Sequence, residues 1–138
     1  MQLRPIAEAD LEFARTLRNA NREFFLDDAE ISPQQQLDWF RALGSKPIDF
    51  FVIEDDGVVV GTISAKRSSG WVEIGNLLLT PAARGRGLMR QAVSELTTAP
   101  GRYFSEVKSH NERSLAVFRA TGFTVAAIGP CLRLEKMT

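Results

Sequence analysis

A long strand that is almost wholly apolar at its end, and that leads into a glycine-rich loop and a helix, is the feature that most constrains this fold. The strand spans Trp71 to Thr80 and ends in three consecutive leucines, Leu77, Leu78 and Leu79. A strand of this composition is typical of the interior of a sheet and predicts burial on both faces. The chain is therefore expected to form an α/β (α+β) fold around a central sheet.

The remaining periodicity predicts the order strand, helix, helix, three strands, helix, strand, helix and two short strands. Helical spacing of apolar residues follows Asp10, the expected N-cap, and Ser32, which opens a capping box with Gln35. A turn at Asp55-Asp56-Gly57 predicts a β-hairpin. The expected strands are 3–6, 50–53, 58–63, 71–80 and 103–107 with two more around 129–130, and the expected helices are 11–18, 33–43, 88–97 and 111–121.

A length of 138 residues fits one domain, 1–138, and the composition, 44% hydrophobic and 25% charged, is that of an ordinary folded protein. The 17 Lys and Arg residues balance 17 Asp and Glu residues, so no overall charge draws the chain to nucleic acid or to an anionic membrane. One cysteine, Cys131, excludes an intrachain disulfide and a cysteine-based zinc site, and no metal site is expected. Because no apolar signal segment follows Met1, a cytoplasmic location is the default expectation.

The loop after the apolar strand, Arg84-Gly85-Arg86-Gly87, has the properties of a phosphate-binding loop. A helix N-terminus offers unpaired N–H groups and the positive end of the helix dipole, and glycines leave the approach open. Arg84, Arg86 and Arg90 add positive charge, which favours a polyanion such as a pyrophosphate. A glycine-rich turn with solvated arginines is the alternative. The loop is neither a Walker loop nor a dinucleotide fingerprint, because the residues that complete those motifs are absent.

A second motif lies near the C-terminus and follows the pattern Asn, small residue, aromatic, then Gly-Phe. Its residues are Asn111, Ser114, Phe118, Gly122 and Phe123. Together with the glycine loop at this spacing, it resembles the GNAT superfamily of acyl-CoA-dependent N-acetyltransferases, and the resemblance covers essentially the whole chain. It implies a mixed sheet of six to seven strands with four helices, and a splay of two central parallel strands, here Trp71–Thr80 and Tyr103–Val107. The implied reaction transfers an acetyl group from acetyl-CoA to an amine.

The resemblance also implies which residues hold acetyl-CoA. The pantetheine arm enters between the splayed strands and pairs with the main chain of Leu77, Leu78 and Leu79, where the Leu78 N–H is expected to polarise the thioester carbonyl. The pyrophosphate lies on the glycine loop and the first turn of the next helix, and the second motif completes the site. The implied contacts there are Arg84, Gly85, Arg86, Gly87, Leu88, Met89, Arg90, Asn111, Ser114 and Phe118.

Glu73 is the expected general base, since some members of this superfamily keep a base in the Glu-Ile run of this strand. The alternative for Glu73 is an outward-facing, solvated strand residue. Two positions depart from the family pattern. Phe118 stands where a tyrosine commonly protonates the leaving thiolate, and Met89 replaces a smaller residue of the cofactor loop. A noncatalytic acyl-CoA-binding domain is therefore an alternative to an enzyme.

The acceptor is expected to bind against the N-terminal half, through Arg22, Phe24 and Phe25. This segment resembles that of GNAT members that acetylate nucleotide-linked amino sugars, whose phosphate would suit Arg18, Asn19 and Arg22. A small primary amine is the leading expectation. Similar patterns occur in members that acetylate ribosomal-protein N-termini, which leaves a protein or peptide amine open. Family members often dimerise, so a homodimer is open as well.

Overall fold

A seven-stranded mixed sheet forms the centre of the protein, in the strand order β1-β2-β3-β4-β5-β7-β6. The computed structural model describes all residues, 1–138. The strands are β1 (Gln2–Pro5), β2 (Ile48–Asp55), β3 (Val58–Ser68), β4 (Trp71–Leu79), β5 (Arg102–Lys108), β6 (Thr124–Ala127) and β7 (Cys131–Met137). The α-helices are α1 (Leu11–Ala20), α2 (Pro33–Ala42), α3 (Leu88–Leu96) and α4 (Glu112–Ala120). The predicted fold class, element order and numbers of strands and helices are confirmed.

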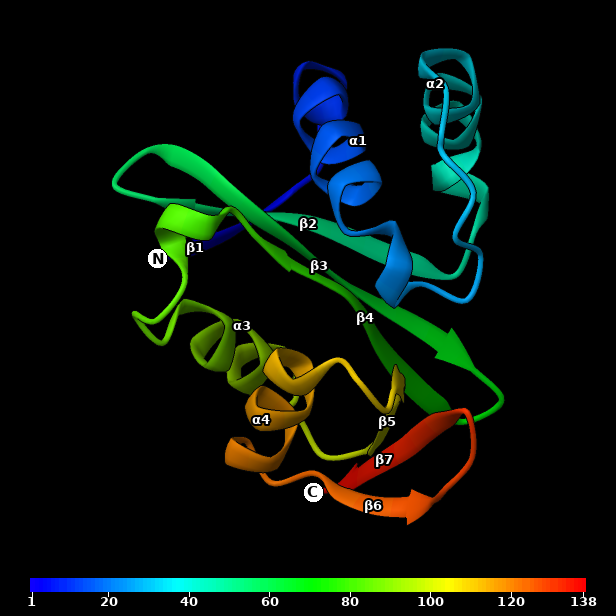
Figure 1. Cartoon of the computed structure of the whole chain (residues 1–138), viewed down its shortest axis with the longest axis vertical. Coiled ribbons are helices and arrows are strands. Elements are labelled where there is room, and N and C mark those ends of the chain that lie inside the picture. The colour runs from blue at the N-terminus through cyan, green and yellow to red at the C-terminus, as the bar shows by residue number, and fades with distance from the viewer.

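The sheet separates two helical layers, with α1 and α2 on one face and α3 and α4 on the other (Figure 1). The larger core lies under α3 and α4 and includes Ile74, Val93 and Phe118. The smaller core lies under α1 and α2 and includes Leu11 and Val52. None of the helices has the length and apolar character that a membrane crossing requires.

The two central parallel strands, β4 and β5, pair only where they begin. Val72 pairs with Tyr103 and Glu73 with Phe104, and no further pair follows. Beyond Glu73 the strands part, so β4 keeps only β3 as a hydrogen-bonded neighbour along the rest of its length. The splay of central parallel strands that the family resemblance implies is thus present.

A β-bulge in β4 lies where the two strands part. Two residues of β4, Asn76 and Leu77, stand opposite the single residue Ile63 of β3. Asn76 has a φ of 55°, in the left-handed region that asparagine tolerates better than most residues. Its side-chain amide donates to Ser64 Oγ at 2.9 Å, and its main-chain carbonyl accepts from Thr62 Oγ1 at 2.8 Å. Because a bulge bends and twists a strand, these bonds hold β4 in the curved path that separates it from β5.

The first two helices begin in different ways. Asp10 occupies the predicted N-cap position of α1, but its side chain makes no capping hydrogen bond: its carboxylate accepts the Ala7 N–H at 2.7 Å and pairs with Arg4 at 2.9 Å, in a short 3-10 turn before the helix. The arginine, which lies on the neighbouring strand β1, takes the carboxylate away from the helix end. The Ser32 capping box is confirmed, because the Gln35 N–H donates to Ser32 Oγ at 3.2 Å at the start of α2.

The prediction that the strand from Trp71 is buried on both faces is also wrong. Within β4 only Ile74 and Leu78 are buried, and the other residues are partly exposed. The splay is the physical reason, since β4 has no neighbouring strand on its β5 side along the apolar run. Leu77 and Leu79 border a cleft there. The run of leucines therefore forms a cleft wall as well as part of the core.

Candidate functional site

The space between the diverging strands belongs to a single cleft of about 680 Å³. Its walls come from β3, β4 and β5, from the glycine loop Arg84–Gly87 with the start of α3, from α4, and from the end of α1 with the segment that follows it. A volume in this range suits a small-molecule ligand. The cleft brings together the C-terminal motifs and the N-terminal segment that the sequence assigned to cofactor and acceptor.

The glycine loop borders the cleft beyond the end of β4. Gly85 and Gly87 have φ values of 79° and 76°, a backbone conformation that residues with side chains rarely adopt. The main-chain N–H groups of residues 85–90 have no acceptor within the protein, and no side chain caps α3. A row of unpaired N–H groups at the positive end of a helix dipole is an anion-binding arrangement. The geometry therefore matches the phosphate loop expected from the sequence.

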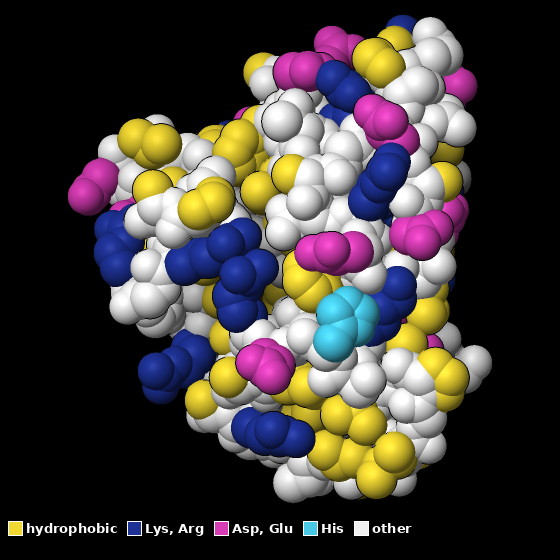
Figure 2. All heavy atoms as spheres, in the orientation of Figure 1, with side chains coloured by type: hydrophobic (Ala, Val, Ile, Leu, Met, Phe, Trp, Pro, Cys, Tyr) yellow, Lys and Arg dark blue, Asp and Glu magenta, His cyan; other side chains and the backbone are white.

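Three arginines without an acidic partner surround this loop. Arg84 and Arg90 line the cleft from the loop and α3, and Arg113 lines it from the first turn of α4. Partial burial and the positive charge of Arg113 lower the pKa of Arg84 below its ordinary value. Figure 2 shows Lys and Arg side chains gathered on this face, over the glycine loop and the start of α3. A bound polyanion would relieve the mutual repulsion of these cations.

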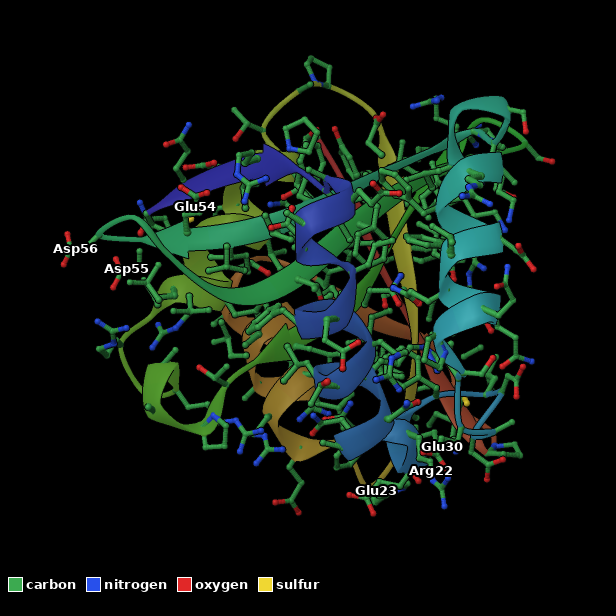
Figure 3. The ribbon with its side chains drawn as sticks, turned by 90° about the horizontal axis from the view of Figure 1, so that it is seen from above. Arg22, Glu23, Glu30, Glu54, Asp55 and Asp56 are labelled. Atoms are coloured by element: carbon green, nitrogen blue, oxygen red, sulfur yellow. The ribbon has the colours of Figure 1, made fainter.

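Arg86 is directed elsewhere. Its guanidinium pairs with Asp55 in the β2–β3 turn at 2.8 Å, and it does not line the cleft. Figure 3 shows this turn, marked by Glu54, Asp55 and Asp56, projecting at one edge of the molecule. The ion pair ties the glycine loop to the hairpin, which leaves Arg86 its main-chain N–H as a group for a ligand.

Leu88 and Met89 open α3 with their side chains turned inwards. They are 7% and 6% exposed and belong to the core between α3 and the sheet. The long side chain of Met89 therefore packs into the core instead of extending from the loop. Contact of Leu88 and Met89 with a phosphate falls to their main-chain N–H groups.

The splayed part of β4 offers main-chain groups to the cleft, which Leu77, Leu78 and Leu79 all line. Ladder bonds between antiparallel strands involve alternate residues of each strand. Because the Thr80 N–H donates to the Val60 carbonyl at 2.9 Å, the N–H of Leu78, two residues earlier in the same ladder, also faces β3. Leu79 then directs its N–H towards β5, whereas Leu77 lies in the bulge, where the alternation is interrupted. The register therefore turns the Leu78 N–H, the expected donor, towards β3 and not towards the cleft.

The wall formed by α4 contains Asn111, Ser114 and Phe118. Asn111 caps the helix as predicted, since its side-chain oxygen accepts the Ser114 N–H at 3.3 Å. Phe118 is 1% exposed and offers no hydrogen-bond donor. Tyr103 does not replace it, because its hydroxyl donates to the Ala99 carbonyl at 2.7 Å.

Glu73 lies where β4 and β5 part, half-buried in the cleft and without a hydrogen-bond donor for its carboxylate. Burial raises the pKa of Glu73 above its ordinary value; the charge of Glu106 adds to the rise, and Lys66 and Arg133 oppose it. A carboxylate with a raised pKa in a cleft is suited to accept a proton near neutral pH.

Two of the three residues expected at the acceptor reach the cleft. Phe24 and Phe25 line it, and the Phe24 ring stacks on His110 with the ring centroids 5.4 Å apart. Arg22 does not line the cleft: it is exposed, and its guanidinium lies 3.7 Å from the carboxylate of Glu30. Figure 3 shows Arg22 and Glu30 side by side after α1, far from the β2–β3 turn.

Several cleft residues were not anticipated, namely Lys66, Glu106 and Arg113. Arg113 carries a signal that sequence reasoning passes over. It follows the Asn111 cap within the first helical turn, where a positive charge opposes the helix dipole. Such a local conflict points to a role outside the helix. Lys66 and Glu106 carry no comparable signal, because charged residues are ordinary on a solvated strand face.

Comparison with known proteins adds a family and a fold. The model of the acetyltransferase (GNAT) family matches residues 14–123. No curated protein sequence matches the chain.

Solved structures of similar fold have low sequence identity to this chain. A ribosomal-protein-alanine N-acetyltransferase from Brucella melitensis is 21% identical, with 100% of both chains covered and a TM-score of 0.82. A putative acetyltransferase, yncA, from Salmonella typhimurium, solved with its cofactor acetyl-CoA, is 24% identical, covering 99% of this chain and 93% of that one, with a TM-score of 0.78. A spermidine N-acetyltransferase from Vibrio cholerae, in complex with CoA and spermine, is 16% identical, covering 99% and 94%, with a TM-score of 0.80.

Proposed function

Because the chain belongs to the GNAT acetyltransferase family, we propose that it transfers the acetyl group of acetyl-CoA to the primary amine of a small molecule. The amine attacks the thioester directly while both substrates are bound. The observation that carries the proposal is the cleft along β4, which joins a main-chain phosphate site beyond one end of the strand to a half-buried carboxylate near the other.

The residues around the cleft fit acetyl-CoA, which supplies an activated acetyl thioester when bound. The N–H groups of residues 85–90, with Arg84, Arg90 and Arg113, would hold the pyrophosphate. The open edge of β4 offers the main-chain groups of Leu77 and Leu79 to a pantetheine arm. We expect the Leu77 N–H, in the bulge, to donate to the thioester carbonyl oxygen as negative charge develops on it.

Glu73 would act on the acceptor. A primary amine is mostly protonated at neutral pH and must lose a proton before or during its attack. Glu73 has a raised pKa and no protein donor on its carboxylate, so it is free to take that proton. The positive charge of Lys66, on the adjacent strand, would favour the carboxylate form of Glu73.

The leaving thiolate has no acid in the position of Phe118. We expect it to depart without direct protonation by the protein, because a thiol has a pKa of only about 8 to 9 and its anion is a tolerable leaving group. The apolar wall at Phe118 is therefore compatible with turnover.

The first test measures the melting temperature with and without saturating acetyl-CoA, with ATP and NAD as controls. A ligand at a hundred times its dissociation constant stabilises the folded state by about 2.7 kcal/mol, which raises Tm by several degrees for a domain of roughly this size. Turnover is then followed as acetylated product by mass spectrometry, because Cys131 lines the cleft and would react with thiol reagents used to detect CoA.

A panel of amines, assayed with acetyl-CoA, distinguishes a small-molecule acceptor from a peptide acceptor and from a protein without activity. Product from amino-sugar nucleotides or polyamines supports the small-molecule acceptor, and product from peptides alone would move the acceptor to a protein N-terminus. Binding of acetyl-CoA without any product would favour a noncatalytic acyl-CoA-binding domain. No Tm shift with acetyl-CoA would contradict the proposed cofactor site. The cytoplasmic location and the homodimer stay predictions.

A further inference from the structure

Arg18, in the last turn of α1, lines the acceptor side of the cleft. Its guanidinium carbon lies 4.0 Å from the centroid of the Phe25 ring, a cation–π contact. Its Nη2 donates to the main-chain carbonyl of Asp27 at 3.2 Å. The ring and the carbonyl hold the guanidinium in one orientation on the cleft wall.

The rest of this guanidinium is unpaired. Nη1 has no hydrogen-bond partner but is closed off from solvent, so it is not the atom that a ligand would reach in this conformation. Nε forms no hydrogen bond either, and no acidic side chain forms an ion pair with Arg18. Burial lowers the pKa of Arg18, although the nearby charge of Asp27 opposes the change. A partly buried cation without an ion pair destabilises the free protein, and an oxyanion that meets the Nε and Nη2 edge of the guanidinium from the cleft would offset part of that cost.

Acetyl-CoA phosphates do not account for Arg18. Their expected site is the start of α3, which covers the opposite face of the sheet from α1 (Figure 1). The loop arginines and the free N–H groups already provide for them there. Lys66 of β3 lines the same cleft, but it faces Glu73, and its charge acts on that carboxylate. Asp27 is the carboxylate near Arg18, and it forms no ion pair with it. The acceptor side thus holds one cation, Arg18, that a simple amine leaves without an anion.

We infer that the acceptor carries an oxyanion, a carboxylate or a phosphate, in addition to its amine, and that Arg18 binds this oxyanion. A planar guanidinium recognises carboxylates and phosphates through paired N–H donors, which orients the ligand as well as attracting it. With the anion on Arg18, the amine is directed towards Glu73. The inference rests on the proposed function, because it specifies the acceptor class of the same site.

Matched pairs of amines test the inference. Glucosamine 6-phosphate is compared with glucosamine, and phenylalanine with phenylalaninamide, at saturating acetyl-CoA, with acetylated product as the readout. We expect the charged member of at least one pair to have the higher kcat/KM. We expect Arg18→Gln to raise the KM of that member roughly 10- to 100-fold, the range for hydrogen bonds to charged groups, and to raise the KM of the neutral member far less. The pair that responds distinguishes phosphate from carboxylate.

Control variants separate anion binding from a structural role. Arg41→Gln removes an exposed arginine of α2 that lies outside the cleft, and it is expected to change neither member of a pair. Arg18→Lys keeps the charge and should restore part of the preference for the charged amine. If Arg18 only braced the segment at Phe25, Arg18→Gln would lower activity towards charged and neutral amines alike.

Binding gives a second readout that does not need turnover. Each charged amine is added to the CoA-saturated protein, and a rise in Tm is expected that Arg18→Gln abolishes. The inference is wrong if no charged amine raises Tm, or if the wild type shows no preference within any pair. The proposed function is tested separately, by the rise in Tm with acetyl-CoA and by the acetylation of neutral amines. If both are observed but charged amines are not preferred, this inference alone is wrong.

Discussion

The two ends of the cleft are formed by different chemical groups, main-chain N–H groups at one end and side chains at the other. The cofactor end depends on consecutive residues, whose main-chain N–H groups at 85–90 are left free by two left-handed glycines. The acceptor end depends on single side chains that α1, β3 and β4 bring together, among them Arg18, Lys66 and Glu73. A site made of main-chain N–H groups keeps its ligand contacts through most side-chain substitutions, whereas a site made of side chains loses a contact with each substitution. We therefore expect substitutions to alter acceptor binding more readily than cofactor binding.

The largest expected effect comes from a charge at the cofactor end. A Cβ at Gly87 would meet no atom within 4 Å, so a larger residue fits, although the φ of 76° strains it. Gly87→Glu places a carboxylate beside the free N–H groups, where like-charge contact with phosphate costs several kcal/mol. We expect acetyl-CoA affinity to fall at least about 100-fold. The measurement is the loss of the acetyl-CoA-dependent rise in Tm.

Gly57→Glu is the matched control for this variant. Gly57 has a φ of 77° and equally open surroundings, but it lies in the β2–β3 turn outside the cleft. It carries the same backbone strain and should keep the shift. Loss of the shift in both variants would assign the effect to strain and contradict the anion site.

At the acceptor end, Glu73→Gln should lower kcat by about 100-fold or more, the usual contribution of a general base. The acetyl-CoA Tm shift should persist, because the cofactor end is intact. Glu106→Gln removes a neighbouring carboxylate of the same cleft and is expected to reduce kcat far less. An unchanged kcat in Glu73→Gln would exclude Glu73 as the base.

The pH dependence of kcat gives a second test of Glu73 as the base at the acceptor end. Glu73 must be ionised to act, and its pKa is raised, so kcat should fall as the pH falls through that raised value, above the ordinary 4.5. The fall of kcat on the acidic side of the pH profile is the acid limb. Glu106→Gln should move this limb to lower pH, because it removes a negative neighbour of Glu73, and Lys66→Gln should move it to higher pH, because it removes a positive one. An acid limb that stays in place in both variants would contradict the assignment.

The raised pKa of Glu73 also affects the stability of the folded state. A carboxyl with a raised pKa in the folded state stabilises that state at low pH, and the contribution is lost as the pH rises through the folded pKa. At pH 8 the buried charge of Glu73 is therefore unfavourable. Glu73→Gln is expected to melt no lower than the wild type there.

The smallest expected effect is that of Phe118→Tyr, which restores the phenol of the family pattern. We expect kcat to change by less than about threefold, because a thiolate leaves readily without protonation. The hydroxyl enters a side chain that is 1% exposed, and an unsatisfied buried hydroxyl costs about 1–3 kcal/mol, which Tm would report. A tenfold gain in kcat would instead show that thiolate protonation limits the wild-type reaction.

The sequence was sufficient where a feature depends on near neighbours. The Ser32 capping box, the Asn111 cap and the glycine loop each depend on residues within a few positions, so their spacing predicts their structure. The inward turn of Met89 was also accessible, since Leu88, Met89, Ala92 and Val93 follow the spacing of one buried helix face.

Partners distant in the sequence were not predictable in this way. Arg86 pairs with Asp55, which lies in another hairpin, and nothing in the glycine loop itself indicates that choice. The burial of the apolar strand was overestimated for a related reason, because the composition of β4 does not reveal that β5 leaves its side after Glu73. Gly75 inside this strand was the available signal for the bulge that follows it.

The brief contact between β4 and β5 also affects how the domain holds together. Within the sheet, only the pairs Val72–Tyr103 and Glu73–Phe104 connect an antiparallel block, β1 to β4, to a second block, β5 to β7, and the rest of the connection is side-chain packing in the larger core. Such blocks can open as separate cooperative units in hydrogen exchange. A ligand hydrogen-bonded along β4 between the blocks would couple their opening. Substrate binding would then enlarge the unit of the sheet that unfolds together, which hydrogen exchange would report as slower exchange in both blocks.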